Sequence, residues 1–376
     1  MIAQDRDAIR AIVADFTRRH VTDAAIDAAW TRGTLHDRSV HRALAREGLI
    51  GATWPADLGG QDLDPVSAGW LWEAMNYHRL PIDLLELTEM VAHVIVVVGS
   101  VVQRKRILPR VRSGEMLISL GYSEPGAGSD VAACATRAVR QGDGWVINGS
   151  KIFTTGAHVA DLVFVLARTG PDASRHRGLS LFLVPRKSTG VEVRPIHTFG
   201  GERTNAVFFT DVVVDADALV GAVDDGWSVL NLALDFERQV MGAYAGQARR
   251  LFDDLVSVLE SRIVDPVTTH ELARVNVRLE EARVLADDVG ARAAARQPID
   301  VAAAMAKLAV TESLKELAYL GLDLVGPESL ICATEQGRRQ SGGLEHWFRH
   351  AQVVTIYGGS NEIQRDIIAR RGLGLG

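Results

Sequence analysis

The order of hydrophobic and polar positions divides the chain into three parts, and the first of them is helical. In residues 1–117 apolar side chains recur at spacings of three and four, which is typical of amphipathic helices; examples are Ala8, Ile9, Ile12, Val13 and Phe16, then Val66, Trp70, Leu71 and Met75. Pro55 and Gly59-Gly60 interrupt this pattern. A basic helix over residues 103–110 is predicted to end at Pro109, with its charges in solvent. We expect an N-terminal α-helical domain over residues 1–117.

The second part, residues 118–220, has the composition of β-strands. Runs rich in β-branched and aromatic residues are separated by turn residues such as Gly170-Pro171 and Gly190; they cover residues 161–168, 179–184, 191–194 and 206–214. The dipeptide Asn148-Gly149 predicts a two-residue hairpin turn between residues 144–147 and 150–153. We expect a middle β domain, either a barrel or a sandwich.

The third part, residues 221–376, returns to the helical period. One long helix is predicted over residues 227–262, and three more are expected at residues 275–296, 301–324 and 362–371. Successive long helices with short connections predict an antiparallel bundle. The predicted fold class is therefore α+β, with a helical domain, a β domain and a C-terminal helical bundle.

Composition excludes several classes of protein. The chain has 376 residues, of which 47% are hydrophobic and 23% charged, as in a soluble globular protein with two or three domains. A net charge of -6 argues against nucleic acid or an anionic membrane as a partner. The N-terminus does not resemble a secretory signal, and the longest apolar run, residues 90–102, is too short to span a membrane. Cys134 and Cys332 indicate neither a disulfide framework nor a zinc site, and no metal-ligand spacing is present, so a reducing cytoplasm is the expected location.

A glycine-rich stretch at residues 121–130 is the first candidate for chemistry. Its glycines allow backbone amides to approach an anion, and Ser123 and Ser129 add hydroxyl groups. The predicted hairpin would bring Phe153 and Thr155 towards this loop, which would suit a ligand with a ring and a phosphate. From these residues alone an ordinary surface loop followed by a hairpin is the preferred interpretation. No GxGxxG leads into a helix, so a nicotinamide-binding Rossmann fold is not supported.

Four strings in register resemble the acyl-CoA dehydrogenase family along nearly the whole chain: SEPGAGSD, NGSKIFTTGA, FFTDVVV and IYGGSNEIQRDIIARRGLG. The resemblance implies an FAD flavoprotein that removes the α-proton of an acyl thioester while the β-hydride passes to the flavin. The expected substrate is an acyl-CoA or an acyl-carrier thioester, and the expected electron acceptor is electron-transfer flavoprotein.

The family motifs assign the cofactor contacts in this chain. The resemblance places Tyr122, Ser123, Phe153 and Thr155 at the isoalloxazine ring and Ser129, with Gly128, on the phosphate side. Ser123 replaces the usual threonine and Phe153 the usual tryptophan, and each swap keeps the hydroxyl or the aromatic face. The matching C-terminal positions that contact the cofactor are Ser360 and Glu362.

The catalytic base is not where most family members have it. The usual glutamate follows a tyrosine in a Tyr-Glu-Gly-Thr motif, and here that position is Gly358. A branch that includes isovaleryl-CoA dehydrogenase carries the base in a Leu-Asp-x-Glu-Arg context, which this chain has at residues 234–238, so the resemblance nominates Glu237 as base and Arg238 as a contact to the CoA portion.

Helical geometry supports Glu237 independently of the resemblance. Its neighbours three and four positions away are all apolar: Ala233, Leu234, Val240 and Met241. A carboxylate in an apolar stripe faces the core or a cavity, where burial raises its pKa and suits it to accept a proton. A glutamate on a polar face and a structural glutamate paired with a distant arginine remain the alternatives.

Gly358 keeps one expected role. The resemblance implies that its backbone N–H donates to the thioester oxygen, and the missing side chain leaves room for a branched, cyclic or bulky acyl group.

The match weakens at the motifs that bind the FAD of a neighbouring subunit. The family's Arg-x-x-Phe-Gly and Gln-x-x-Gly-Gly-x-Gly motifs are replaced by residues 260–269 without Phe-Gly and by residues 323–329. Either the chain forms a homo-oligomer with a modified FAD site, or it pairs with a related subunit. Two rival functions remain open: a flavin monooxygenase or oxidase on the same fold, and a non-catalytic partner subunit of a hetero-oligomeric dehydrogenase.

Overall fold

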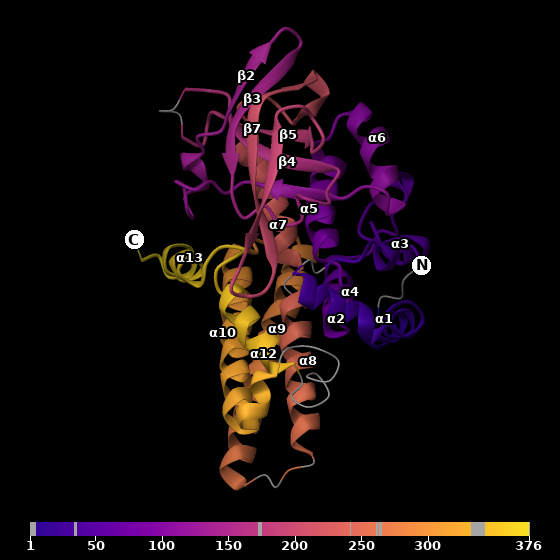
Figure 1. The fold of residues 1–376 in the computed structure, drawn as a ribbon, viewed down its shortest axis with the longest axis vertical. Coiled ribbons are helices and arrows are strands. Elements are labelled where there is room, and N and C mark those ends of the chain that lie inside the picture. The colour runs from indigo at the N-terminus through magenta and orange to yellow at the C-terminus, as the bar shows by residue number, and fades with distance from the viewer. Residues whose placement is uncertain are drawn as a thin grey trace.

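The computed structural model describes residues 5–33, 36–171, 175–240, 242–260, 262, 265–331 and 343–375. Figure 1 shows a β region at one end, a long bundle of helices at the other, and the N-terminal helices packed beside the junction between them. The α+β fold class predicted from the sequence is confirmed. No helix in these described ranges is long and apolar enough to cross a membrane.

The N-terminal helices are α1 (Arg6–His20), α2 (Asp23–Arg32), α3 (Arg38–Arg46), α4 (Pro65–Tyr77), α5 (Asp83–Val98) and α6 (Val101–Arg112). Side-chain caps set where several of them begin: Asp64 accepts from two backbone N–H groups ahead of α4, and Pro65 takes the first helical position. The predicted end of a helix at Pro109 is wrong, because α6 continues to Arg112. A proline in the last turn removes one N–H donor, yet its own carbonyl still accepts from Ser113.

The middle region is a single mixed sheet of eight strands in the order β6-β7-β3-β2-β4-β5-β8, with β1 parallel to β4. The strands are β1 (Ile118–Gly121), β2 (Arg137–Gln141), β3 (Gly144–Lys151), β4 (Leu162–Arg168), β5 (Leu179–Pro185), β6 (Val191–His197), β7 (Arg203–Val214) and β8 (Leu219–Val220). Apolar side chains from β3, β4, β5 and β7 share one buried core, which places the two halves of the sheet against each other.

The hairpin predicted at Asn148-Gly149 is wrong. These residues lie within β3, at a shift of register against β7, and the turn of the β2–β3 hairpin is at residues 142–143 instead. The bulge is fixed by hydrogen bonds between the Asn148 side chain and both the backbone and the carboxylate of Asp211. Gly149 has a φ of 146° and a Cβ there would lie 2.6 Å from Thr136 Oγ1, so close packing and backbone shape account for the glycine.

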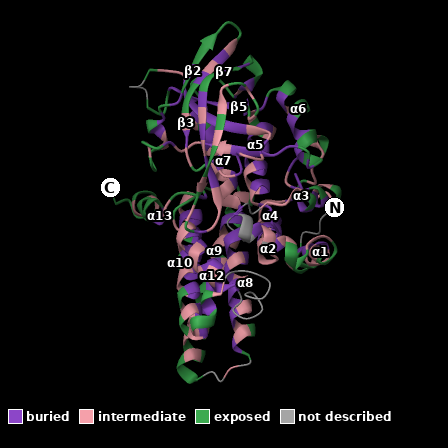
Figure 2. Cartoon of the chain, in the orientation of Figure 1, coloured by how far each residue is buried: buried purple, intermediate pink, exposed green. Residues whose placement is uncertain are grey.

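The C-terminal helices are α7 (Gly226–Gln239), α8 (Gly242–Leu259), α9 (Pro266–Ala294), α10 (Asp300–Val325), α12 (Leu344–Val353) and α13 (Asn361–Ile367). The single helix predicted over residues 227–262 is therefore wrong: α7 ends after Gln239, where the Val240 N–H bonds to the Phe236 and Glu237 carbonyls, and α8 begins at Gly242. Buried faces of α8, α9, α10 and α12 form one core, visible as the purple stripes in Figure 2.

A buried ion pair joins the glycine-rich loop to the sheet. Lys151, at the end of β3, is fully buried, and its Nζ lies 2.7 Å from Glu124 Oε1 and 3.3 Å from the Tyr122 carbonyl. Glu124 also accepts from the N–H groups of Ala135 and Thr136, at 2.7 and 2.9 Å. Burial opposes the charge on Glu124, but Lys151 and these donors lower the pKa of Glu124 to about 2. Residues 122–124 are thus fixed to the end of β3 and to the segment that leads into β2.

Replacing Lys151 with methionine should leave the Glu124 carboxylate buried without its cation. We expect a loss of about 3–5 kcal/mol in the free energy of unfolding at neutral pH, measured by denaturant titration. The wild-type contribution should be complete above pH 4.5 and should be lost as the pH falls towards 2. Glu192→Gln, which removes the exposed Glu192–Arg194 pair, is the control and should leave the midpoint unchanged. An unaltered midpoint for Lys151→Met would contradict this role.

Candidate active site

The loop that follows β1 presents open backbone. Gly126, Gly128 and Ser129 are exposed, and a Cβ built on either glycine would have no atom within 4 Å. The half-buried Ser123 is tied to the end of β3, because its carbonyl accepts from the Ile152 N–H at 2.9 Å. The loop is anchored at one end and accessible at the other, as a backbone nest for an anion requires.

Phe153 is an exposed aromatic residue on a strained backbone. It follows β3 with a φ of 55°, and 60% of it is exposed. The strained conformation is held by its neighbour: the Thr154 N–H donates to the Asn205 carbonyl, and the Asn205 amide donates back to the Thr154 carbonyl, both at 2.9 Å. Strain maintained in this way is typical of ligand sites. Thr155 comes next and lines a shallow hollow together with Asp83, Glu202 and Arg203, among others.

Glu237 and Gly358 lie in contact although they are far apart in the sequence. Glu237 is in the last turn of α7, and a Cβ built on Gly358 would lie only 2.7 Å from its Oε1. Gly358 has a φ of 64°. No hydrogen bond or ion pair to the Glu237 carboxylate exists among the described residues, which argues against a structural glutamate paired with a distant arginine. Met241, one of the predicted apolar neighbours, lies outside the described residues.

The surroundings of Glu237 favour its neutral form. Burial raises the pKa of Glu237, and the positive charges of Lys307 and Arg238 oppose this rise. Tyr122 faces the same space: its hydroxyl is buried without a hydrogen-bond partner in the described part of the chain, and burial and the Glu237 charge raise its pKa. A carboxylate and a phenol without partners beside exposed backbone N–H groups can exchange a proton with a ligand and orient it.

Comparison with known proteins identifies the family. The N-terminal, middle and C-terminal domains of acyl-CoA dehydrogenases match residues 3–115, 119–212 and 224–373. The chain belongs to the acyl-CoA dehydrogenase family. It is an oxidoreductase acting on CH–CH groups, and the family consists of flavoproteins of lipid metabolism.

Among its relatives, the acyl-CoA dehydrogenase IpdE1 of Mycobacterium tuberculosis is 37% identical over 90% of this chain and 88% of its own. A solved structure described as the Tcur3481-Tcur3483 steroid ACAD is 30% identical with a TM-score of 0.93, covering 99% of this chain and 97% of that one. The ChsE4-ChsE5 complex from Mycobacterium tuberculosis is 27% identical with a TM-score of 0.86, covering 99% of this chain and 97% of the other.

The other residues predicted for the site of this acyl-CoA dehydrogenase form contacts of their own. Arg238 is half-buried and forms ion pairs with Asp235 at 2.6 Å and with Asp300 at 3.1 Å. Ser360 caps α13 and accepts weakly from the Ile363 N–H at 3.5 Å, while Glu362 is exposed. Among the residues that the structure describes, no hydrogen bond links Gly128 or Ser129 to the Glu237 group.

Sequence reasoning missed two acidic residues at this site. Asp83 and Glu86 lie in the first turn of α5 and are half-buried; burial raises the pKa of both, and that of Glu86, which also feels the Glu237 charge, reaches about 8. Acids repeated every three positions, at Asp83, Glu86 and Glu89, in a mainly apolar helix were the available signal.

Two residues that hold the Gly358 turn were also missed. Lys307 of α10 donates to the Tyr357 and Gly359 carbonyls, and Gln364 donates to those of Gly358 and Gly359 at 3.1 and 3.0 Å. A single lysine in the apolar stretch 301–310 was the signal for the first.

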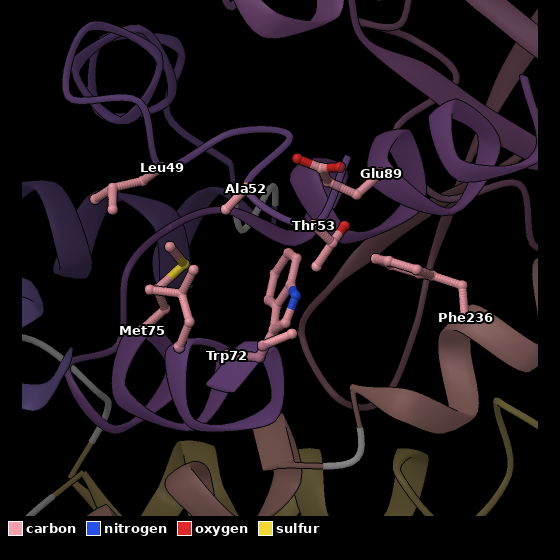
Figure 3. Close-up of a pocket in the computed structure, with 9 residues that line it drawn as sticks. Leu49, Ala52, Thr53, Trp72, Met75, Glu89 and Phe236 are labelled. Carbon is pink, nitrogen blue, oxygen red and sulfur yellow. The ribbon is translucent and has the colours of Figure 1, made fainter. Parts of the chain in front are cut away.

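A separate small hollow, bordered by Phe236, lies between α4, α5 and α7 (Figure 3). The Glu89 carboxyl borders this hollow, and burial raises its pKa to about 7. The Gly51 N–H donates to this carboxyl at 2.5 Å, which partly opposes the rise. The lining is otherwise mainly apolar, so the hollow belongs to the packing of the N-terminal helices behind the site.

Gly358→Ala should reduce turnover of acyl-CoA at least tenfold, because the new methyl group would displace the Glu237 carboxylate and the backbone has a positive φ. The measurement is steady-state turnover with a dye acceptor, with bound flavin and thermal midpoint recorded for both proteins. Gly142→Ala is the matched control: its φ is also positive, at 59°, but nothing lies within 4 Å of the added Cβ. If both variants lost the same fraction of turnover, backbone strain alone would explain the effect.

Proposed function

We propose that this acyl-CoA dehydrogenase catalyses the FAD-dependent α,β-dehydrogenation of a bulky, ring-bearing acyl-CoA, with Glu237 as the base. The observation that supports it is the contact between the unpaired Glu237 carboxylate and Gly358. In the family's motif the position of Gly358 carries the base, so Glu237 presents a carboxylate at the place where the motif requires one.

The residues present fit a flavin. A nest of exposed amides at Gly126 and Gly128 suits the phosphates, and the exposed ring of Phe153 suits one face of an isoalloxazine. Tyr122, Ser123 and Thr155 would hold the ring, and Ser129, Ser360 and Glu362 would contact the rest of FAD. When bound, FAD supplies the acceptor for the β-hydride, so that loss of the α-proton to Glu237 leaves a carbon–carbon double bond.

The chain's own groups perform the proton transfer and stabilise charge. Glu237 must be ionised to accept the α-proton, and its raised pKa makes it a stronger base than a solvated glutamate. Negative charge then develops on the thioester oxygen, where the Gly358 N–H is available: it has no acceptor among the described residues. Arg238 would contact the CoA portion, with its charge shared between Asp235 and Asp300.

A polar, bulky acyl group suits the residues around Glu237. Gly358 contributes no side chain, although the Glu237 carboxylate takes part of the room that this leaves, and Glu86 and Tyr122 place an acid and a hydroxyl near the same space. Such groups disfavour a plain alkyl chain, because the chain would desolvate them without forming hydrogen bonds in return. They can bind hydroxyl or carbonyl groups on a ring system. The similarity to a structure described as a steroid ACAD supports a steroid-derived thioester.

The assembly is proposed to be a hetero-oligomer with a related subunit, and electron-transfer flavoprotein is proposed as the acceptor of electrons. Arg262, in the region of the altered Arg-x-x-Phe-Gly motif, pairs with Glu328 of the second altered motif and with the Val325 carbonyl. The arginine is therefore engaged within its own chain. A relative solved as a complex of two proteins supports the same arrangement.

The function is tested by anaerobic bleaching of the flavin with a panel of acyl-CoA thioesters: steroid-derived, branched, and straight medium-chain. We expect the ring-bearing thioesters to react fastest, and a clear preference for straight chains would refute the substrate class. Glu237→Gln should slow bleaching by about 10²–10⁴-fold, because the base is lost, while the far-UV spectrum and flavin content stay unchanged.

In the wild type the rate should fall as the pH decreases through the pKa of Glu237, because the protonated carboxyl cannot accept the α-proton. Since burial raises this pKa, the fall should occur at a higher pH than for a solvated glutamate. Glu281→Gln, at an exposed carboxylate of α9, is the control and should leave the rate and its pH dependence unaltered. Full activity of Glu237→Gln would exclude it as the base.

Expression alone and together with a related subunit should give different flavin contents. If each FAD site needs contacts that the altered motifs at residues 260–269 and 323–329 do not provide, the co-expressed complex should hold about one flavin per two chains, measured by absorbance against total protein. One tightly bound flavin per chain in the protein expressed alone would instead indicate a homo-oligomer.

A further inference from the structure

Lys307 is a buried cation in an apolar stretch of α10. Among the hydrogen bonds of the described residues, its ammonium contacts only main-chain carbonyls. It lies in the first two turns of α10, is 2% exposed, and donates to the Tyr357 carbonyl at 2.7 Å and to the Gly359 carbonyl. Burying a lysine is unfavourable unless its ammonium is hydrogen-bonded or paired, and burial lowers the pKa of Lys307 to about 8. The two carbonyls that it binds flank Gly358.

We propose that Lys307 is a positioning residue: it fixes the direction of the Gly358 N–H and supplies the positive charge that faces the Glu237 carboxylate. The inference rests on the proposed function, since it concerns the base and the oxyanion donor of that reaction.

The direction of the Gly358 N–H follows from peptide geometry. The peptide bond between Tyr357 and Gly358 is trans, so the Tyr357 carbonyl and the Gly358 N–H point in opposite directions within one plane. Binding that carbonyl to Lys307 on one side therefore directs the N–H to the other side. The turn needs such a restraint, because Gly358 and Gly359 both have positive φ values, 64° and 79°, and glycines are conformationally free.

In the part of the chain that the structure describes, both acids and cations face Glu237. Glu86 of α5, Tyr122 after β1 and Tyr244 of α8 all interact with its charge and are acids. The cations are Lys307 and Arg238, and the charge of Arg238 is shared with Asp235 and Asp300. Lys307 itself also faces the exposed Glu362.

Because burial disfavours ionised Glu237, removing the Lys307 charge makes the base harder to deprotonate. The acidic limb of the pH–rate profile then moves to higher pH.

The test compares Lys307→Met, Lys307→Gln and Lys307→Arg in the flavin-loaded protein, co-expressed with its partner subunit if flavin binding requires one. The matched control is Lys315→Met, a lysine two turns further along α10 with no contact to the turn among the hydrogen bonds of the described residues. Two readouts are used: hydrogen exchange of the peptide spanning residues 356–364, followed by mass spectrometry, and the pH profile of flavin reduction with the best acyl-CoA of the panel.

Lys307→Met should lower kcat by about 10²-fold with little change in KM, since one oxyanion donor loses its direction. It should also accelerate exchange at residues 356–364 and move the acidic limb to higher pH. Lys307→Gln keeps a donor without the charge, so it should retain much of the protection and still move the limb. Lys307→Arg keeps the charge and should leave the limb in place, and Lys315→Met should behave as the wild type.

The inference is overturned if Lys307→Met leaves both exchange and limb unchanged, or if exchange rises equally over the whole chain. If Lys307→Met does not fold, the glutamine and arginine variants decide, because they differ in charge. If none of the acyl-CoA thioesters in the panel reduces the flavin of the wild-type protein, the proposed function is refuted. The exchange measurement would still test whether Lys307 restrains the turn.

Discussion

The buried ion pair between Glu124 and Lys151 is the constraint on which the site depends. A carboxylate and an ammonium without water are stable only when all their partners are in place. Glu124 has Lys151 and the N–H groups of Ala135 and Thr136, and Lys151 also holds the Tyr122 carbonyl. The positions of Tyr122 and Ser123 are thus fixed by contacts to the sheet, and do not depend on the glycine-rich loop that follows them.

The opposite side of the site uses the same device. Lys307 is buried and binds the carbonyls on both sides of Gly358, as Lys151 binds the carbonyl of Tyr122. In both cases a long aliphatic side chain reaches from a rigid element, β3 or α10, and its ammonium fixes irregular backbone that has no ladder of its own. Irregular segments can therefore present unpaired groups, a phenol at Tyr122 and an N–H at Gly358, without losing a defined shape.

Periodicity was sufficient for the class of the fold, and its errors have specific causes. Asn148-Gly149 carries the strongest hairpin signal in the chain, yet long-range pairing of β3 with β7 makes it a bulge, because the Asn148 side chain finds Asp211 across the strands. The break after Gln239 has no proline or glycine to announce it, since the first glycine is Gly242. Helix α12 was not predicted either; its apolar face is completed by α10, which a local pattern does not reveal.

The candidate site divides in the same way. Glu237 could be nominated from its apolar neighbours and its motif, whereas Lys307 and Glu86 gain their meaning only from contacts across 50 or more residues. Gln364 contacts the turn from only five or six residues away, but no periodic pattern marks that contact.

Glu237 and Gly358 are best understood as one feature. A side chain at residue 358 and the carboxylate at residue 237 would claim the same volume, because a Cβ there would lie 2.7 Å from Oε1. The end of α7 adds a further constraint: Glu237 lies in its last turn, near carbonyls left free at a helix C-terminus, where negative charge is unfavourable. A base at this place therefore needs a cation that is not held in an ion pair by another carboxylate. Arg238 forms ion pairs with Asp235 and Asp300, whereas the hydrogen bonds of Lys307 go to neutral carbonyls, and its charge acts on Glu237 and on the exposed Glu362. Moving the base onto this helix thus requires the glycine, the end of α7 and the buried lysine together.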